Sequence, residues 1–456
     1  ISLGFLDQDG NVKTNNYKRY TARVSNDIQV FKDLKVGYNV TGLSSKSRDI
    51  PTTIYHQLYG AAPSVPVFNA DGSYGDPKTQ NLGDGANYNP QASIDFFNQQ
   101  TKQYSITGNV YAELKFAKHF TFRTSFGGEF GQIENRKYAP VYRATEAQKA
   151  DISTLDLKRI ETRNWIIENT LTYDNTFAID HKLTLLLGQS AQSNKAYTVN
   201  ASAQNVPFNT EADLYLSLGD AASRSVADQG SLIKFASYFA RANYAFKNKY
   251  LINASMRADG ASQFFGSSDA WGYFPSVGAG WVITNEDFMK DQKVFSSLKL
   301  RGSWGLIGNA SVPINASQQT LAQNGNLVAI FNNTPYTGKS INTLIPPSIV
   351  WEKGIGSNVG LEAAFLNNRL TVETDFYNRK TSKAIFKIPV LGSLGREVKQ
   401  MLGNQADIQN RGVEFSATWS DQTSGGLAYS ISGNISYNAN KVLNVASGQT
   451  PIFSGS

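Results

Sequence analysis

The stretch "YFARANYAFKNKYLINASMRADG", residues 238–260, carries one pattern twice, on either side of the polar turn "FKNK". In each half, apolar or aromatic residues alternate with largely polar ones. Alternation with a period of two predicts β-strands, because successive side chains along a strand point to opposite faces. The stretch therefore predicts a hairpin with two different faces. Its apolar face would carry Tyr238, Ala240, Ala242, Tyr244, Ile252, Ala254 and Met256. Its polar face would carry Arg241, Asn243, Asn253, Ser255 and Arg257.

The same alternation recurs along the whole chain, in "LKVGYNVT", "FTFRTSF", "VGAGWVI" and "VEFSATW" among others. We count about fifteen such segments, each near the roughly ten residues that a tilted membrane strand needs. The pattern alone fits a soluble sandwich as well as a membrane barrel, since each has one apolar face per strand. It therefore predicts an all-β protein but does not decide whether the sheet lies in water or in a membrane.

The connections between these segments favour the membrane barrel. Short ones alternate with long ones, and the short ones read "FKD", "AKH", "NTFAIDH", "FKNK", "LNN" and "DQTSGG". The long ones cover residues 44–101, 132–161, 193–231 and 309–350. Short turns at one end of the strands and long loops at the other are typical of outer-membrane barrels. We therefore predict a transmembrane antiparallel β-barrel.

The composition argues against an enzyme and against a nucleic-acid-binding protein. The chain has no Cys and three His, which we place in turns (His119, His181) and in a loop (His56). Without a His pair at ligand spacing or a nucleophile–base pair, we expect neither a metal site nor a catalytic site. The net charge of +7 comes from scattered Lys and Arg rather than from a basic run, so we expect no nucleic-acid partner.

Several long motifs resemble the barrel region of the SusC/RagA-type TonB-dependent outer-membrane transporters. They are spread over most of the chain, in the order in which that family has them. They read "DQDGNVKTNNYKRYTARVSNDIQ", "YLINASMRADGASQFFGSSDAWGYFPSVGAGWVITNEDFMK", "LKLRGSWGLIGN", "WEKGIGSNVGLEAAFLNNRLTVETDFYNRKTSKAIF" and "NQADIQNRGVEFSATWS".

The resemblance implies a specific architecture and function. The family forms barrels of about 22 strands with a plug domain inside. It imports glycans or peptides across the outer membrane of Gram-negative bacteria, is driven by the TonB complex, and uses a SusD-like surface lipoprotein as a lid. It implies no cofactor. On this basis residues 1–456 would be a partial barrel domain, with the N-terminal plug, the region that contacts TonB and the C-terminal strands missing from the chain.

Two groups of residues are candidates for contact with partners or substrate. In the predicted barrel the polar residues of the strands face the lumen, where they contact the plug, line the substrate path or are simply solvated. These candidates are Arg241, Asn243, Asn253, Ser255, Arg257, Asp259, Arg301, Glu373 and Asp375. Aromatic residues of the long loops are candidates for contact with an oligosaccharide, a peptide or the lid, with loop packing as the alternative. These are Tyr55, Tyr59, Phe331 and Tyr336.

Two other functions remain open from the residues themselves. A passive porin-like channel would show the same strands but would need no plug and no TonB. A secreted or surface β-rich binding protein would bury its apolar strand faces against protein instead of against membrane lipid.

Overall fold

The structure of the 456-residue chain is a computed structural model. It describes residues 1–80, 88–207, 214–265, 269–314, 321–341, 349–389 and 400–445. Contacts divide the chain into two compact units. The first unit comprises Ile1–Ala112, Ser125–Ile166 and Ser193–Leu232, and the second comprises Glu113–Thr124, Ile167–Gln192 and Ile233–Ser456.

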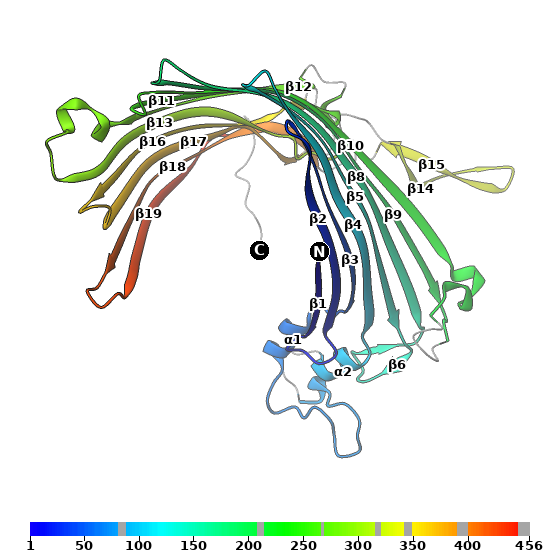
Figure 1. Ribbon diagram of the computed structural model, residues 1–456. Helices are drawn as coiled ribbons and strands as arrows, with labels where there is room; N and C mark the ends of the chain where they lie inside the picture. The colour runs from blue at the N-terminus through cyan, green and yellow to red at the C-terminus, as the bar shows by residue number, and fades with distance from the viewer. Residues whose placement is uncertain are drawn as a thin grey trace. The chain divides into compact units, whose positions relative to one another are not determined.

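One sheet of 15 strands dominates the fold, which confirms the all-β class predicted from the period-two pattern. Figure 1 shows its strands as arrows in chain order, from blue β1 to red β19. The strands are β1 (Ser2–Asp9), β2 (Asn16–Phe31), β3 (Leu34–Arg48), β4 (Asn98–Phe116), β5 (Phe120–Ala139), β8 (Thr154–Phe177), β9 (His181–Gln204), β10 (Ser225–Phe246), β11 (Tyr250–Ala261), β12 (Trp271–Val282), β13 (Phe295–Asn309), β16 (Glu352–Phe365), β17 (Leu370–Pro389), β18 (Gln400–Gln422) and β19 (Ala428–Asn444).

Each strand of this sheet is hydrogen-bonded to the next one along the chain. The registers described for β1–β2–β3 and for β10 through β19 are all antiparallel. Two small sheets lie within connections: β6 (Tyr142–Arg143) pairs with β7 (Lys149–Ala150), and β14 (Leu321–Phe331) pairs with β15 (Thr334–Ile341). Sequential antiparallel pairing is the topology expected for hairpins joined by short turns.

Many of the strands are longer than the sequence predicted, although β1, β11 and β12 have between 8 and 12 residues. β8 and β9 have 24 residues each, so the expected length near ten residues is wrong for them. The predicted connections 132–161 and 193–231 are correspondingly too long, because much of each is strand. Strands that extend past an apolar zone keep their ladder hydrogen bonds but no longer need an apolar face, so the alternation that marks a strand disappears. Parts of the predicted connections 44–101, 193–231 and 309–350 lie outside the described residues.

The short turns at one end of the strands match the prediction. Between β10 and β11, Lys247 and Asn248 have φ of 52° and 50°, and between β8 and β9, Ala178 and Ile179 have φ of 48° and 63°. Two successive residues with positive φ define the type I′ turn, whose twist matches that of the flanking strands. Glycine and asparagine suit these positions, whereas a β-branched residue such as Ile179 is strained there.

The longest connection, between β3 and β4, is folded rather than irregular. It contains the helices α1 (Ile54–Gly60) and α2 (Pro90–Asp95), so the expectation that His56 lies in a loop is wrong. Ile54 and Ile94 are buried together with Val12, and this apolar contact fixes both helices. Within the described part of the chain, no helix has the length and apolar character needed to cross a membrane.

The side chain of Asn89, at the start of α2, links several segments of this connection by hydrogen bonds. The Asn89 side chain accepts hydrogen bonds from the backbone of Gln91 and Ala92, and so caps the helix. Its amide nitrogen donates to two backbone carbonyls of the preceding segment, and its backbone pairs with the Gln148 side chain from the β5–β8 connection. Asn89 is 3% exposed. Specific hydrogen bonds therefore hold the β3–β4 and β5–β8 connections to each other.

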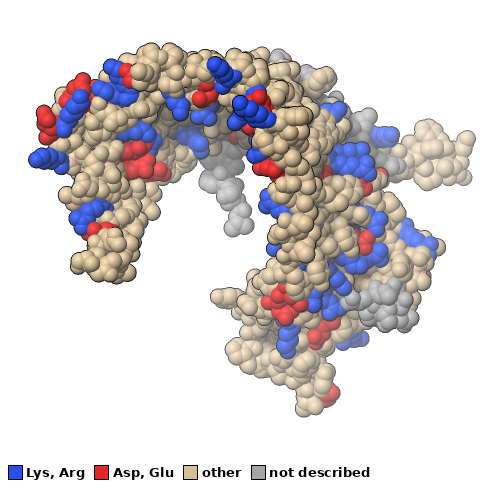
Figure 2. All heavy atoms as spheres, in the orientation of Figure 1, with Lys and Arg blue, Asp and Glu red and all other residues tan. Residues whose placement is uncertain are grey.

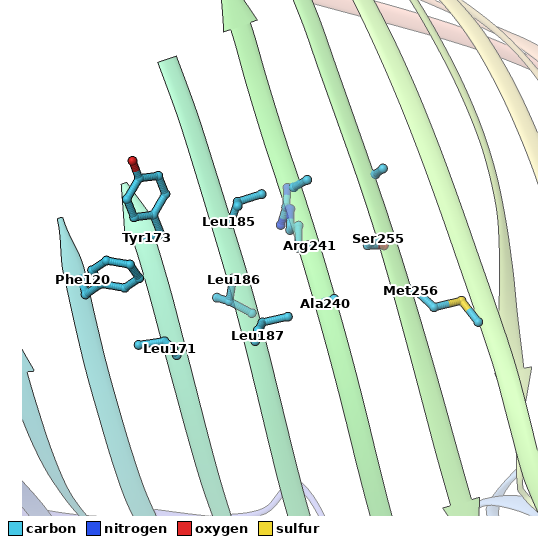
Figure 3. Close-up of a pocket in the computed structure, with 12 residues that line it drawn as sticks. Phe120, Leu171, Tyr173, Leu185, Leu186, Leu187, Ala240, Arg241, Ser255 and Met256 are labelled. Carbon is cyan, nitrogen blue, oxygen red and sulfur yellow. The ribbon is translucent and has the colours of Figure 1, made fainter. Parts of the chain in front are cut away.

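The hairpin that opened the sequence analysis has two faces of opposite character. In its register Ala240 is opposite Met256 and Ala242 is opposite Ala254, whereas Arg241 is opposite Ser255. In Figure 3, Leu185, Leu187 and Met256 lie in front of the strands, and Arg241 and Ser255 lie behind them. We call these the apolar face and the polar face. Large apolar side chains on the apolar face are solvent-exposed in the isolated chain, among them Tyr238, Ile252, Val277, Val359, Phe376 and Ile435.

Aromatic rings gather where the strands meet the short turns. Phe116 stacks on Phe120 across the β4–β5 turn, and Phe177 stacks on His181 across the β8–β9 turn. Phe246 stacks on Tyr250 in the same way. Aromatic residues at strand ends are typical of the girdles at which a membrane barrel meets the lipid headgroups.

The strained turn gives a first prediction. Replacing Ile179 by Gly (I179G) should stabilise the intact protein by about 1 kcal/mol, because glycine adopts φ of 63° without steric cost. Denaturant unfolding in lipid vesicles measures the change. Asn248→Gly is the matched control and should gain much less, since asparagine already tolerates this conformation. Equal gains in the two turns would contradict the assignment of strain to Ile179.

The two faces give a second prediction. Ala254→Arg should destabilise the folded barrel by about 2–4 kcal/mol if the position lies near the bilayer midplane, because the apolar face would then expose a charge to lipid. Ser255→Arg, one residue along the same strand, should be tolerated. Heat-modifiable mobility on a gel and unfolding in vesicles measure both variants. If both positions accept arginine equally, the apolar face does not meet lipid.

Candidate functional site

The residues predicted to face a lumen all lie on the polar face. In the β10–β11 register Arg241 is opposite Ser255 and Asn243 is opposite Asn253, while Arg257 and Asp259 are opposite Phe239 and Ser237 on the same side. From Ser255 the polar face continues through β12 to β13 and reaches Arg301, Glu373 and Asp375. The structure therefore places all nine on one side of the sheet, and their contact with a lumen remains a prediction.

Arg301 is the centre of a charge cluster that joins three strands. From β13, its guanidinium donates to Glu362 at 2.8 Å and to Asn358 at 3.1 Å, both on β16. It also donates to Asp375 at 2.8 Å and to Glu373, both on β17. One arginine thus neutralises carboxylates from two neighbouring strands. We call Arg301, Lys299, Glu362, Glu373 and Asp375 the Arg301 cluster.

The geometry explains why an arginine is needed in this cluster. Glu362 and Glu373 are directly opposite each other in the β16–β17 register, where two like charges destabilise a sheet. Arg301 binds both, and Lys299 adds a contact of 3.2 Å to Glu362. A guanidinium has several donors in a fixed plane, so it can serve three carboxylates at once. The cluster therefore replaces the repulsion between Glu362 and Glu373 with ion pairs that link neighbouring strands.

A glycine makes room for the Arg301 cluster. Gly360 is opposite Arg301 on one side and opposite Asp375 on the other. A Cβ at this position would lie 2.5 Å from Asp375 Oδ1 and 2.8 Å from Arg301 Cζ. Among the described residues Asp375 Oδ1 is buried and has no hydrogen-bond partner, while Asp375 Oδ2 binds Arg301. The cluster thus keeps one buried acceptor unused.

The other charged candidates are engaged within their own hairpin. Arg257 donates to both carboxylate oxygens of Asp259, at 2.7 and 2.9 Å, and to the Ser237 hydroxyl at 3.0 Å. Its guanidinium also lies 5.2 Å from the centre of the Phe239 ring. Arg241 donates to Asn243 at 3.1 Å. These contacts orient the side chains along the polar face.

A polar hollow adjoins the Arg301 cluster, and the sequence analysis did not find it. It has a volume of about 810 Å³ and lies over β11–β13 and β16–β19. Its polar lining comprises Asn253, Ser276, Ser303, Asn358, Tyr377, Arg379, Asn410, Glu414 and Asn438. Tyr377 donates to Asn438 at 3.0 Å, which fixes its ring across two strands. The signal was present in the alternating Asn, Tyr and Arg of β17 and β18, but only the cross-strand register brings these residues together.

The aromatic candidates belong to two different connections between strands. Tyr55 and Tyr59 are on α1 in the first unit, and Tyr59 is 96% exposed. Phe331 and Tyr336 are on the β14–β15 hairpin in the second unit, with their rings edge to face at 5.8 Å. Each pair leaves aromatic surface uncovered in the described chain.

A half-buried tyrosine in the β3–β4 connection helps to hold that region in place. Tyr74 donates to Asp95 at 2.9 Å, and its ring packs edge to face against Phe96. Burial, and next the hydrogen bond to Asp95, raise the pKa of Tyr74 to about 12. The phenol is therefore protonated and acts as a donor throughout the physiological pH range.

The chemistry of the polar face is that of binding by hydrogen bonds and charge. Over the part of the chain that the structure describes, no group of three or more acidic, His or Cys side chains has the arrangement of a metal site. On the side of the molecule drawn in Figure 2, basic and acidic side chains are interspersed rather than gathered in one patch of a single sign. Amide, hydroxyl and guanidinium groups on a strand face can bind a polar molecule through hydrogen bonds.

A large sheet of sequentially paired strands, with an exposed apolar face, a polar face and an aromatic girdle, defines the class of outer-membrane β-barrels. The chain belongs to the TonB-dependent receptor family: the family model described as "TonB dependent receptor-like, beta-barrel" matches residues 5–453. Members of this family are β-barrels of the outer membrane of Gram-negative bacteria.

Individual TonB-dependent receptors are similar in sequence to the chain over almost its whole length. The chain is 29% identical to TonB-dependent receptor P3 of Formosa agariphila over 98% of its own length and 44% of that protein. It is 27% identical to TonB-dependent receptor SusC of Bacteroides thetaiotaomicron over 98% of its length and 46% of SusC. The chain therefore spans less than half the length of these relatives. The resemblance to SusC/RagA-type transporters that the motifs predicted is confirmed.

A solved structure shows the same fold. The RagAB peptide transporter structure superposes with a TM-score of 0.84 at 23% identity, over 98% of this chain and 49% of that one. More distant siderophore receptors, such as PiuA of Acinetobacter baumannii, superpose with a TM-score of 0.56 at 13% identity. The long strands and their order are thus a property of the fold at low sequence identity.

The glycine of the Arg301 cluster gives the third prediction. Gly360→Ala should destabilise the protein by about 1–3 kcal/mol, because the new methyl group meets Asp375 and Arg301 well inside contact distance. Gly356→Ala is the matched control on the same strand and the same face, where a Cβ meets nothing within 4 Å. It should be neutral or slightly stabilising. Unfolding in vesicles compares the two, and equal effects would contradict the role assigned to Gly360.

Proposed function

We propose that the chain forms part of the wall of a TonB-dependent importer of the outer membrane, with its polar face lining the passage for a glycan or peptide. Further strands of the intact protein would complete the barrel, and a plug would occupy its interior. The apolar face would meet lipid. The chain itself would carry out no chemistry on its cargo.

The observation that carries this proposal is the polar face with its hollow of about 810 Å³. Asparagine amides, a tyrosine and an arginine line it, and such groups bind hydroxyl-rich or amide-rich solutes through many weak hydrogen bonds. A passage needs contacts of this kind, since a solute that binds too tightly is not released.

The long connections support a second part of the proposal, a SusD-like lid. They hold the exposed Tyr55 and Tyr59 in one unit and the exposed Phe331 and Tyr336 in the other. Tyr is enriched at protein interfaces, and a stable lid would bury well over about 1,000 Å² of surface in total. The lid would hold the cargo against the mouth of the barrel before the plug opens.

The fourth prediction separates an energised importer from a passive channel. Cells that produce the intact protein are offered a size ladder of oligosaccharides and a tryptic peptide digest, and depletion from the medium is followed by mass spectrometry. We expect depletion of one of the two classes, and its loss in a strain that lacks TonB. A passive porin-like channel would continue to deplete the medium without TonB. Absence of depletion in both strains would overturn the import proposal.

The fifth prediction concerns the lid. The intact protein, purified in mild detergent, should carry a second subunit, and shortening the connection between β13 and β16 should weaken that association. Shortening the β18–β19 turn, residues 423–427, is the matched control at the opposite end of the strands and should leave the association unchanged. If no second subunit accompanies the intact protein, and the shortened connection leaves uptake unchanged, the lid proposal fails.

A further inference from the structure

The polar hollow is built around an aromatic ring that lies along the sheet. Tyr377 is opposite Gly412 in the β17–β18 register, and Gly412 is opposite Asn438 in the β18–β19 register. A Cβ at Gly412 would lie 2.6 Å from Tyr377 Oη and 2.7 Å from Tyr377 Cζ, so the hydroxyl end of the ring fills the space above this glycine. The hydroxyl then donates to Asn438 Oδ1 at 3.0 Å. The Tyr377 side chain therefore spans three strands.

The fold accounts for only one face of this ring. An aromatic side chain that covers a glycine of a neighbouring strand stabilises a sheet, which explains the contact between Tyr377 and Gly412. The Tyr377 side chain is half-buried and lines the hollow. Within the described chain, no second aromatic ring and no basic side chain stacks on Tyr377. The ring face that is turned away from the sheet is therefore open to the hollow.

The hollow extends beside the ring over β16, where one strand residue is a glycine. Gly356 is opposite Arg379, which lies two residues along β17 from Tyr377. A Cβ at Gly356 meets nothing within 4 Å, so the space above this residue is open. The volume of about 810 Å³ lies within the usual range of roughly 300–1,000 Å³ for small-molecule sites. The hollow therefore has room for a solute against the open face of the ring.

Two side chains of opposite charge flank the ring. Arg379 lies two residues from Tyr377 on β17, so it is on the same face of the sheet. Glu414 lies two residues from Gly412 on β18 and is also on the polar face. Arg379 and Glu414 are exposed, line the hollow, and form no hydrogen bond or ion pair with another described residue. They give the hollow both donors and acceptors, and their charges cancel.

Carboxamide groups complete the rim of the hollow. Asn358 is opposite Tyr377 on β16, and its oxygen accepts from the Arg301 guanidinium at 3.1 Å. Asn410, on β18, accepts from Asn440 at 2.6 Å. Each oxygen is thus engaged within the sheet, and each carboxamide still has its nitrogen as a donor.

An open aromatic face with a rim of planar polar groups fits the chemistry of a pyranose. The C–H bonds on one side of a pyranose form a flat apolar surface that packs against an aromatic ring, and its hydroxyls point outward from the edge. Each hydroxyl both donates and accepts, so it can bind a carboxylate, a guanidinium or a carboxamide. The hollow supplies these groups in Tyr377, Arg379, Glu414 and Asn410.

The same site suits a peptide less well. Proteins bind extended peptides by adding them to a strand edge and by holding alternate side chains in pockets. Strands β11 to β18 are each paired on both sides, so their backbone groups are already used. Apart from Tyr377, the described lining of the polar face has one large apolar side chain, Ile307, which is 60% exposed. The part of the hollow over these strands therefore offers a peptide no free edge and no apolar pocket.

We propose that Tyr377 is the stacking platform for a neutral pyranose unit of the cargo, and that Arg379 and Glu414 bind its hydroxyls. This inference rests on the proposed import function, and it narrows the cargo from a glycan or peptide to an uncharged glycan. Because the charges of Arg379 and Glu414 cancel, the hollow favours neither an anionic nor a cationic cargo. Tyr377 is thus a specificity-determining residue of the passage.

The test is native mass spectrometry of the intact protein in mild detergent, offered partial hydrolysates of amylose, cellulose, xylan and mannan, and separately a tryptic peptide digest. We expect oligosaccharides of at least one hydrolysate to bind and peptides not to bind. Tyr377→Ala should weaken oligosaccharide binding about tenfold, because the stacking surface is lost. Tyr377→Phe keeps the ring and should stay within about threefold of the unmodified protein. Phe376→Ala, the neighbouring residue on the apolar face, is the matched control and should have no effect.

The charged groups and the stacking geometry are measured separately. Arg379→Gln and Glu414→Gln should each weaken oligosaccharide binding about fivefold, because each variant loses a hydrogen bond to a charged group. Saturation-transfer NMR should show the strongest transfer to the C–H protons on one face of a sugar unit. This signal should disappear in Tyr377→Ala and persist in Tyr377→Phe, which a purely structural role of Tyr377 would not produce. Heat-modifiable mobility establishes that each variant is folded.

Two results would overturn the proposal. No binding of any hydrolysate, with or without binding of peptides, would mean that the hollow does not recognise a sugar. An unchanged affinity in Tyr377→Ala would mean that the sugar lies elsewhere, and a lowered unfolding temperature in the same variant would show that the ring packs against the plug instead.

The binding measurement needs no TonB, so its outcome is distinct from that of the uptake experiment. Uptake of peptides alone, dependent on TonB, would contradict the pyranose site and leave the import proposal standing. Binding of a sugar at Tyr377 without any uptake would do the reverse.

Discussion

The fold depends on one constraint, which is that a backbone in hydrocarbon must satisfy its hydrogen bonds internally. A strand can do so only through its two neighbours, so a membrane sheet consists of long strands paired in sequence. This accounts for the order β1 to β19, and for the tight turns that join β8 to β9 and β10 to β11 at one end of the strands. The type I′ turns follow from the same requirement, since they return the chain without splaying the pair.

Because the ladder satisfies the backbone, the two faces are free to differ. The apolar face needs only hydrocarbon-compatible side chains, and small residues such as Ala242 and Gly42 serve there as well as large ones. The polar face can hold charges at close range, provided that each has a partner. Gly360 shows that the charges of the polar face also depend on the residue at a strand position. The space over this glycine allows the Arg301 guanidinium to lie between carboxylates of β16 and β17.

The sequence was sufficient to predict the structural features that depend on local, periodic patterns of residues. The alternation around Ala254 and Ser255 identified a strand pair and its two faces, and "FKNK" identified the turn. It did not predict the full length of β8 and β9, because outside the apolar zone the ladder persists without the alternation. It did not predict α1 either, since a helix of seven residues that is held by one buried Ile54 has no periodic signal of its own.

The candidate site was predictable only residue by residue. Arg301, Glu373 and Asp375 were recognised as polar-face residues, but their partnership depends on register between segments 72 and 74 residues apart. No local pattern contains that information. The same holds for the hollow, whose lining comes from seven strands.

Register also separates two charged clusters that look alike in the sequence. Both place basic residues near apolar ones, at alternate positions in "LKLRGSW" and at adjacent positions in "NYKRYTA". On the polar face, pairing brings Lys299 and Arg301 against three carboxylates, so each carboxylate has a basic partner within the sheet. Near the β3–β4 connection, pairing places Lys18 between Asp7 and Lys46, and Lys18 forms its ion pair with Asp7. The sign of the neighbour across the strand, rather than the composition of either segment, therefore decides whether a charged side chain on this sheet stabilises the fold.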